Sequence, residues 1–435
     1  MSKNQQGTLD KSKVKKTLSY RYYMYAILAI AYFFVYFHRT STAVMSQDLI
    51  SSFNIEATSL GLLSSMYFYP YAIAQLPAGI LADKWGARKT VALFVAIAGV
   101  GSIIFGMAPS FEIALVGRAI VGFGVAFIYV PIIRILADWF KRDEFATYSG
   151  VLLAVGNAGS LASAAPLVLL IGLMGWRNSM YSVGGMSIFI GILTYLIVRN
   201  KPEEIGGVSI AEIEGRNISK VASKSIGTME AIKNICKNYN FWTTVIMLSF
   251  MYGTIMGFQG LWANSYVMTV YNMTREQAGN LLSIIPIFMI IGCPLSGVIA
   301  DKIIKSKKTV VLLGCILYTL TWIPLVFMTD SIGLGMLKVL LALYGFFGGF
   351  FVVVYANLKE NIDLSMAATA TGMLNTFVFL CGALFQQIMS AIIAKNTING
   401  VINVQGFKSA FIFCFVALLI CISFYSTQKK KKSDN

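Results

Sequence analysis

The sequence predicts an all-α membrane protein in which twelve transmembrane helices form two pseudo-symmetric six-helix bundles. Three observations support this prediction: the composition, the lengths of the apolar runs and an internal duplication. Of the 435 residues, 57% are apolar and only 12% are charged, whereas soluble domains carry about 25% charged residues. A soluble chain of this length needs more charge to cover its surface, so the composition indicates a protein that crosses the membrane several times.

The apolar runs give the number of helices. About 20 helical residues cross a hydrocarbon core ~30 Å thick, and each run is expected to be helical because lipid cannot satisfy free backbone amides. Residues 1–21 are polar and basic, and the first run is too long for the core of a signal peptide, so we expect the first helix to be retained. Twelve runs have a suitable length, at 22–45, 58–82, 90–108, 112–136, 146–172, 178–198, 240–268, 277–300, 309–328, 333–357, 366–393 and 407–427.

Lysine and arginine predict the orientation. If the N-terminus is inside, 27 of the 35 Lys and Arg residues lie on the cytoplasmic side and four on the opposite side, as the positive-inside rule requires. The same bias explains the net charge of +16 without nucleic-acid binding, for which the chain has no groove-reading motif. We expect a monomer in the plasma (inner) membrane with a cytoplasmic tail 1–21, a bundle 22–198, a cytoplasmic linker 199–239, a second bundle 240–427 and a cytoplasmic basic tail 428–435.

The duplication appears in two loops. "GILADKWGARKT" at 79–90 and "GVIADKIIKSKKT" at 297–309 both follow an apolar run, carry Gly-x-x-x-Asp and end in a basic cluster. Their offset of 218 residues is half of the chain, which indicates two related halves. A weaker echo pairs "GFGVAF" at 122–127 with "GFFGGF" at 345–350.

The first loop resembles the loop 2–3 signature of the major facilitator superfamily, with Lys84 in place of its first Arg. The second copy departs further, because Ile304 stands where Gly86 stands in the first. The resemblance implies alternating access, in which two bundles rock about a site at the membrane midplane. It also implies a cytoplasmic latch between Asp83 and Arg88. The gating residues that we predict are Gly79, Asp83, Gly86, Arg88, Arg134, Asp138, Gly297 and Asp301.

Ionisable side chains inside the predicted spans are the main functional signal, because each costs at least ~2.5–3.5 kcal/mol at a helix centre. The spans contain His38, Arg39, Arg118, Arg134 and Lys338, whereas the acids lie at helix ends or in loops. A guanidinium without a carboxylate partner in a site of low dielectric constant favours an anion. Arg39 and Arg118 are therefore predicted to bind substrate. A structural role remains the alternative for both.

Roles other than substrate binding are possible for these cations, and they differ from one residue to another. Arg39 can instead pair with Asp48 near the end of the first helix. Arg134 lies one turn before Asp138 on the same face, which favours a gate or an ion pair. Lys338 lies near a helix end, from which its long side chain can reach the membrane interface.

The motif "YFHR" at 36–39 narrows the resemblance to the anion:cation symporters and the related organic-anion and sugar-phosphate permeases. These often carry Asp-Arg here, with the Arg as anion ligand. His38 replaces that Asp, and since histidine titrates near 6.5, it is a candidate proton carrier; a packed, neutral His38 is the alternative. A weaker likeness to nitrate/nitrite porters rests on "AVGNAGS" at 154–160, but helices 2 and 8 lack the arginines of those porters.

Neutral polar side chains complete the predicted site: Gln259, Trp262, Asn264, Tyr344, Asn157, Asn375, Tyr67 and Tyr71. They suit a hydrogen-bonding organic molecule. We therefore predict a secondary transporter for a small organic anion or zwitterion of the carboxylate, amino-acid or small-peptide class, with proton-coupled uptake. The alternatives are an inorganic-anion porter, an exporter or a permease-like membrane sensor. With one histidine and neither a catalytic triad nor metal-ligand spacing, the sequence predicts no enzyme, metal or cofactor.

Overall fold

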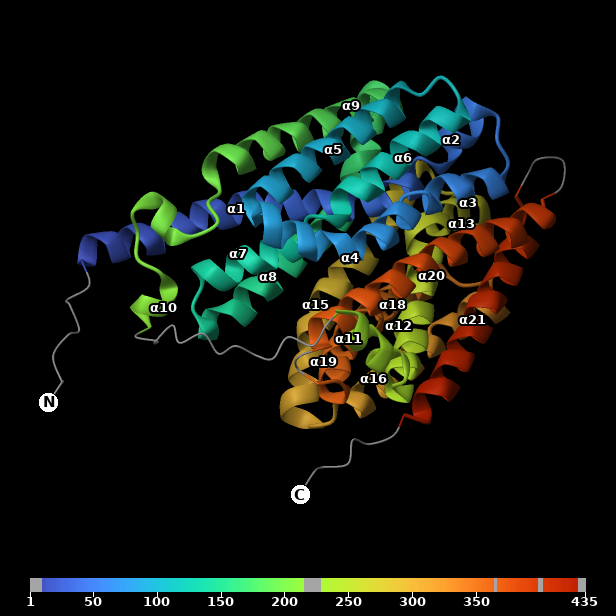
Figure 1. Ribbon diagram of the computed structural model, residues 1–435. Helices are drawn as coiled ribbons and strands as arrows, with labels where there is room; N and C mark the ends of the chain where they lie inside the picture. Colours follow the sequence, from blue (N-terminus) through green and yellow to red (C-terminus); the bar gives the residue numbers. More distant parts are fainter. Residues whose placement is uncertain (1–9, 215–227, 364–365, 398–401, 429–435) are drawn as a thin grey trace, which may run out of the picture.

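The computed structural model describes residues 10–214, 228–363, 366–397 and 402–428, and within these ranges it contains helices and no strand (Figure 1). Ten continuous helical stretches there are long and apolar enough to cross a membrane. The predicted span 58–82 instead comprises two short helices, Ala57–Ser65 and Phe68–Trp85. The predicted span 146–172 covers most of the helix Arg142–Ala162 and the beginning of the helix Ala165–Ile197. The prediction of an all-α protein is confirmed.

The first half of the chain forms one group of helices, blue to green in Figure 1. Helix α9 is broken at Gly175, where φ is +79°, a conformation that glycine adopts without a steric penalty. The helices are α1 Lys11–Val44, α2 Ser46–Phe53, α3 Ala57–Ser65, α4 Phe68–Trp85, α5 Ala87–Met107, α6 Phe111–Ala126, α7 Tyr129–Trp139, α8 Arg142–Ala162 and α9 Ala165–Ile197.

The second half forms the other group, yellow to red in Figure 1. Two of its elements, η2 and η3, are π-helical turns, which often occur at functional sites. Its elements are α12 Tyr239–Gly257, η2 Phe258–Trp262, α13 Ala263–Tyr271, α14 Arg275–Leu282, α15 Ile284–Val298, η3 Ile299–Ile303, α16 Lys307–Leu320, α17 Trp322–Phe327, α18 Leu334–Gly348, α19 Phe351–Asn361, α20 Ala367–Lys395 and α21 Val404–Ser426. The connecting segment contains η1 Pro202–Ile205, α10 Ile210–Ile213 and α11 Thr228–Cys236.

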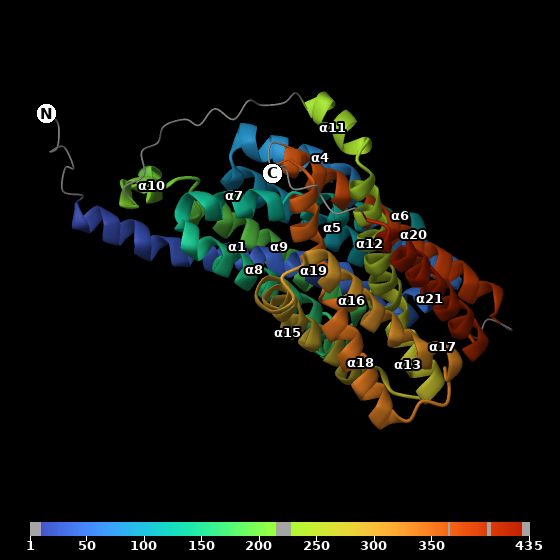
Figure 2. The same cartoon turned by 90° about the horizontal axis from the view of Figure 1, so that it is seen from below.

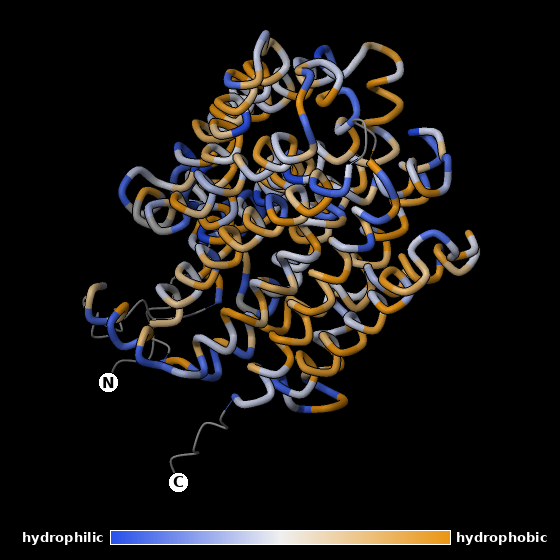
Figure 3. Tube along the Cα trace, turned by 90° about the vertical axis from the view of Figure 1, so that its right-hand side faces the viewer, coloured by the Kyte–Doolittle hydropathy of each residue, from blue (hydrophilic) through white to orange (hydrophobic). Residues whose placement is uncertain are grey.

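The outer surface of the bundle is apolar. Large side chains such as Leu173 and Ile73 are 83% and 73% exposed, and Figure 3 shows hydrophobic residues along the length of the helices. A soluble monomer rarely exposes contiguous apolar surface on this scale. The surface instead suits contact with lipid.

The sequence echo between the two halves corresponds to one kind of close helix contact. A Cβ atom at Gly122 of α6 would collide with the backbone carbonyl oxygen of Tyr67, and one at Gly345 of α18 would collide with the carbonyl oxygen of Ile285. Small residues allow helix backbones to approach this closely in membranes. Each half therefore uses the first glycine of its echo to pack against a neighbouring helix.

The two halves meet along several helix pairs. Helix α20 packs against α3 and α4, α15 packs against α8, and α1 packs against η2. At the end remote from the chain termini, Arg275 Nη1 lies 2.8 Å from Asp48 Oδ2, and the hydroxyl oxygens of Ser46 and Ser265 are 3.0 Å apart. These contacts join the first half to the second.

At the end that carries the termini, α1 extends beyond its neighbours (Figures 1 and 2). This extension is fixed to the first half by a bidentate ion pair, in which Arg21 donates to both carboxylate oxygens of Glu144 at 2.6 and 3.0 Å. Thr17 Oγ1 donates to the carbonyl oxygen of Val208, which lies in the segment after α9, at 3.1 Å. The extension thus ties α8 and the connecting segment to α1.

The Arg21–Glu144 pair predicts a pH-dependent contribution to stability. The hydrogen bonds from Arg21 hold the pKa of Glu144 below its usual value. A carboxylate with a depressed folded pKa stabilises the fold above its unfolded pKa of about 4.3, and that contribution is lost as the pH falls through the folded pKa. We expect Glu144→Gln to lower the thermal midpoint at pH 7 and to have little effect at pH 3, measured by a thermal shift assay.

Glutamine keeps an oxygen that can accept from the Lys141 backbone N–H, as Glu144 Oε2 does at 3.1 Å, so the substitution isolates the charge. A midpoint difference from wild type that is equal at pH 7 and pH 3 would contradict this prediction.

Candidate functional site

Arg39 lies where the two halves meet, and aromatic rings enclose it. Its residue is 5% exposed. The guanidinium carbon is 4.4 Å from the ring centre of Tyr36, 5.4 Å from that of Phe379 and 5.8 Å from that of Tyr71. Tyr36 and Tyr71 belong to α1 and α4 of the first half, whereas Phe379 belongs to α20 of the second. Cation–π contacts of this kind hold a guanidinium without neutralising its charge.

No carboxylate compensates this charge within the described residues, where no Asp or Glu is buried. Arg39 Nε is buried and has no hydrogen-bond partner there, and the phenols of Tyr67 and Tyr252 also lie near it. Asp48, the alternative partner considered from the sequence, pairs with Arg275 instead. A buried guanidinium without an acid is costly unless an anion joins it, so the geometry favours an anionic ligand.

Arg118 has a different environment, although it too is buried. Its Nη1 donates to the backbone carbonyl oxygen of His38 at 3.0 Å, and its guanidinium carbon lies 5.2 Å from the ring centre of Tyr67. Helix α6 is thereby fixed to α1 one residue before Arg39. Tyr67 lies near both guanidinium groups and donates its hydroxyl to the Val35 carbonyl oxygen at 3.1 Å.

His38 faces the interior of the first half. Its Nε2 lies 3.5 Å from Ser187 Oγ on α9, its ring packs beside Phe34 and Phe37, and 1% of the residue is exposed. These neighbours, like Arg118, all belong to the first half. His38 and Arg39 are therefore adjacent in sequence and point into different parts of the molecule.

A hydrogen-bonded chain crosses between the halves close to Arg39. Tyr355 donates its hydroxyl to Asn375 Oδ1 at 2.8 Å, and Asn375 Nδ2 donates to Gln75 Oε1 at 3.4 Å. Gln75 lies one turn after Tyr71 on α4, whose ring packs against Arg39. The chain thus links α19 and α20 to the helix that carries part of the aromatic enclosure.

The other predicted polar residues lie apart from Arg39. Gln259 and Asn264 line a cavity of about 30 Å³ together with Thr40 and Ser163, which is room for a single water molecule. Trp262 donates to Ser390 Oγ at 3.0 Å within the second half. Tyr344 packs among Phe258, Tyr318 and Trp322, and Asn157 donates to the Leu153 carbonyl oxygen of its own helix at 3.0 Å.

Comparison with known proteins decides the family. The protein-family model described as "Major Facilitator Superfamily" matches residues 28–386 of the sequence, which is most of the chain. The chain belongs to the Major Facilitator Superfamily. It is thus an integral multi-pass membrane protein with the major facilitator fold, and the predictions of fold class, family and transport class, as opposed to an enzyme, are confirmed.

Relatives within the superfamily are named for anionic compounds. "Probable sulfoacetate transporter SauU" of Cupriavidus necator is 24% identical over 391 residues, covering 88% of this chain and 90% of the relative. "Probable L-galactonate transporter" of Escherichia coli is 25% identical over 295 residues, 64% of this chain and 63% of the relative. "Probable hexose phosphate transport protein" of Chlamydia pneumoniae is 25% identical over 313 residues, 69% of each chain.

The fold is also similar to that of solved structures. A bacterial homolog of the human lysosomal transporter Spinster, in an inward-facing and unoccupied conformation, aligns with a TM-score of 0.76 and 19% identity. The alignment covers 95% of this chain and 99% of that one. At this identity the likeness shows the fold alone.

The superfamily loop after α4 holds the predicted gating residues. Gly86 adopts φ +86° between α4 and α5, which favours glycine. Arg88 Nε donates to the Tyr195 carbonyl oxygen at 2.8 Å, and its backbone N–H donates to Asn200 Oδ1 at 2.9 Å, so Arg88 contacts the end of α9. The side chain of Asp83 and the surroundings of Gly79 lie outside the described part of the structure, and the latch between Asp83 and Arg88 stays a prediction.

Three further predicted gating residues lie within helices. Arg134 and Asp138 belong to α7, and Gly297 lies near the end of α15. Asp138 lies within electrostatic range of Arg134 and Lys201, and the gating role of Arg134 and Asp138 stays a prediction. Among the described residues, a Cβ atom at Gly297 would meet nothing within 4 Å, and the gating role of this glycine stays a prediction.

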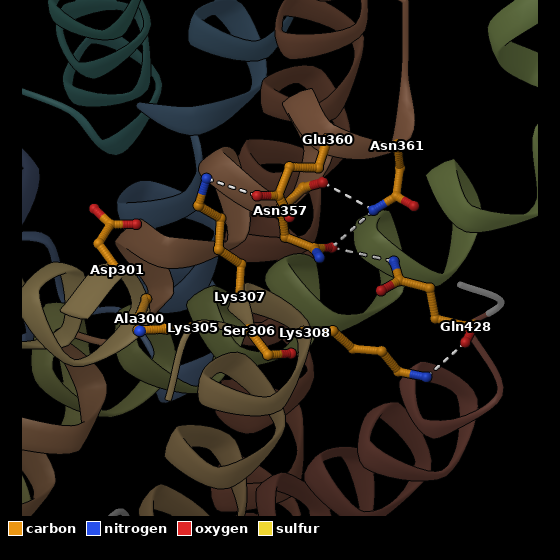
Figure 4. Close-up of a pocket in the computed structure, with 10 residues that line it drawn as sticks. All are labelled: Ala300, Asp301, Lys305, Ser306, Lys307, Lys308, Asn357, Glu360, Asn361 and Gln428. Carbon is orange, nitrogen blue, oxygen red and sulfur yellow. Dashed lines mark hydrogen bonds and ion pairs between the residues drawn. The ribbon is translucent and has the colours of Figure 1, made fainter. Parts of the chain in front are cut away.

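Asp301 lines a cavity of about 520 Å³ formed by η3, α16, α19 and the end of α21 (Figure 4). In this cavity Lys307 Nζ pairs with Glu360 Oε1 at 2.8 Å. Lys308 Nζ donates to the Ser426 carbonyl oxygen at 3.1 Å. Both contacts belong to the second half, so the second loop fixes the ends of α19 and α21.

Proposed function

We propose that this transporter moves a small organic anion or zwitterion by alternating access and that Arg39 binds its acidic group. The observation that carries the proposal is the buried guanidinium of Arg39, which faces both halves and has no carboxylate beside it among the described residues. A site at the junction of two rocking bundles contacts the substrate in both orientations of the carrier. An anion there supplies the missing counter-charge.

The relatives support an anionic substrate. The names of these relatives refer to sulfoacetate, L-galactonate and hexose phosphate. All three compounds are anions at neutral pH, with two acidic groups in sulfoacetate and one in each of the others. Among the residues predicted from the sequence, we propose that Arg39, Tyr67, Tyr71 and Asn375 form the midplane site. We propose that Gln259 and Asn264 line the path between the site and the end remote from the termini, where they border the small cavity.

The test is uptake by purified protein in liposomes. Labelled galactonate, sulfoacetate and glucose 6-phosphate are offered in turn, with and without a pH gradient, and Arg39→Ala liposomes serve as the control. We expect at least one of the three anions to enter faster than in the control. Uptake equal to that of the control for all three anions under every gradient would contradict the proposal.

The remaining features of the proposal concern topology and coupling. We propose both termini and the connecting segment in the cytoplasm, a monomer surrounded by lipid in the inner membrane, and uptake coupled to protons. The excess of Lys and Arg on the proposed cytoplasmic side, 27 residues against four on the opposite side, supports this orientation. For coupling, a proton on His38 would place a positive charge beside Arg118, and their repulsion would disturb the contact that fixes α1 next to Arg39.

This coupling scheme predicts the behaviour of His38→Gln. We expect the variant to lose stimulation of uptake by an inward proton gradient while it still binds the anion, because glutamine keeps a polar group towards Ser187 and cannot take up a proton. Uptake with and without the gradient, together with anion-induced thermal stabilisation, measures both effects. Full stimulation in the variant would remove His38 from the coupling mechanism.

A further inference from the structure

The number of cations at the junction of the halves limits the charge that the site can neutralise. Three arginines are buried among the described residues. Arg21 is paired with Glu144. Arg118, whose Nε also lacks a partner among the described residues, contacts the His38 carbonyl oxygen and the Tyr67 ring of the first half. Arg39 is therefore the one buried cation of the described chain that contacts side chains from both halves.

The second half contributes neutral groups to this junction. Phe379 and Tyr252 approach Arg39 from α20 and α12, and Tyr252 is 6% exposed with a hydroxyl that has no hydrogen-bond partner within the described residues. The side-chain amide of Asn375 and the hydroxyl of Tyr355 belong to the hydrogen-bonded chain that passes close to Arg39. Such groups can bond to hydroxyls of a ligand, but they do not neutralise a second negative charge.

We propose that the site takes a monoanion, one acidic group of single charge on a body that carries hydroxyl groups, and that it discriminates against the dianion of the same shape. This inference rests on the proposed function and narrows its substrate class, because galactonate is the one monoanion at pH 7.5 among the three anions for which the relatives are named. A singly charged carboxylate, sulfonate or sulfate ester matches one guanidinium. Binding of a phosphate monoester dianion would move its second negative charge from water into a site without a second cation to neutralise it, which is strongly unfavourable.

Two sugar esters of nearly equal shape test the inference in the full-length protein. Glucose 6-sulfate is a monoanion throughout the accessible pH range, whereas the second pKa of a phosphate monoester is about 6. At pH 7.5 only about 3% of glucose 6-phosphate is the monoanion, and at pH 5.5 about three quarters is. We expect the apparent affinity for the phosphate to rise about 25-fold between these pH values and that for the sulfate to stay constant, measured by thermal stabilisation or by competition with galactonate uptake.

A variant with a second cation gives an independent test. Tyr252→Arg is expected to reverse the preference at pH 7.5, so that glucose 6-phosphate binds at least about 10-fold more tightly than glucose 6-sulfate. Tyr252→Phe, which keeps the ring and removes the hydroxyl, is the matched control and should keep the preference for the sulfate. The pH series on the wild type stands even if the arginine variant does not fold.

The outcomes separate this inference from the proposed function. Equal or tighter binding of glucose 6-phosphate by the wild type at pH 7.5 would overturn the charge preference and leave anion transport intact. Failure of galactonate, sulfoacetate and both esters to bind would overturn the proposed function, and the charge preference with it.

Discussion

Arg39→Ala is expected to weaken anion binding, and with it uptake, at least about 30-fold. Removal of one partner from a buried, charged pair costs about 2–5 kcal/mol, and each 1.4 kcal/mol is a factor of ten in affinity. Arg39→Lys keeps the charge but loses the planar fork that binds two oxygens at once, so we expect intermediate binding. Ligand-induced thermal stabilisation and liposome uptake measure these effects.

The same substitution distinguishes a ligand from a structural residue. Because Arg39 Nε has no partner in the described part of the chain, its burial opposes folding in the absence of an anion. We therefore expect Arg39→Ala without ligand to be as stable as the wild type or more stable, a common property of functional sites. A lower thermal midpoint without ligand, combined with a full ligand-induced shift, would assign Arg39 to structure and contradict its role in binding.

Arg39 could be predicted from the sequence, but most of its surroundings could not. An arginine within an apolar run stands out because of its free-energy cost, and its own helix also carries Tyr36 one turn earlier. Phe379 and Tyr252 come from distant parts of the chain, and the hydropathy and motifs of a single sequence do not reveal which helices of the two halves meet. A search for aromatic residues in the helices that line superfamily cavities would have included both, without a reason to choose them.

Other differences between the structure and the predictions from the sequence have local physical causes. Asp48 lies 9 positions from Arg39 in the sequence, but it follows the end of α1 and its carboxylate faces Arg275 of the other half. The π-helical turn at Phe258–Trp262 inserts an extra residue into a helix, and hydropathy does not record such an insertion. The breaks within the predicted spans 58–82 and 146–172 likewise leave the apolar pattern unchanged.

The contact between α1 and α8 gives the second prediction of large effect. Gly159 of α8 packs directly on the backbone of α1, because an added Cβ atom would collide with the Phe33 carbonyl oxygen and lie 3.2 Å from the Phe37 backbone nitrogen. Backbone atoms cannot turn aside as a flexible side chain can. We therefore expect Gly159→Ala to destabilise the protein by about 1–3 kcal/mol through overpacking and to reduce uptake by displacing the helix that carries Arg39.

Gly150 supplies the control on the same helix. A Cβ atom there would meet nothing within 4 Å, so Gly150→Ala is expected to leave uptake unchanged and to be neutral or to stabilise α8 by up to about 1 kcal/mol. The two alanines have the same helix propensity, so the difference between the variants isolates the contact with α1. Equal thermal midpoints and equal uptake for the two variants would show that α1 tolerates displacement at Gly159, which would contradict close packing as the means by which α8 positions Arg39.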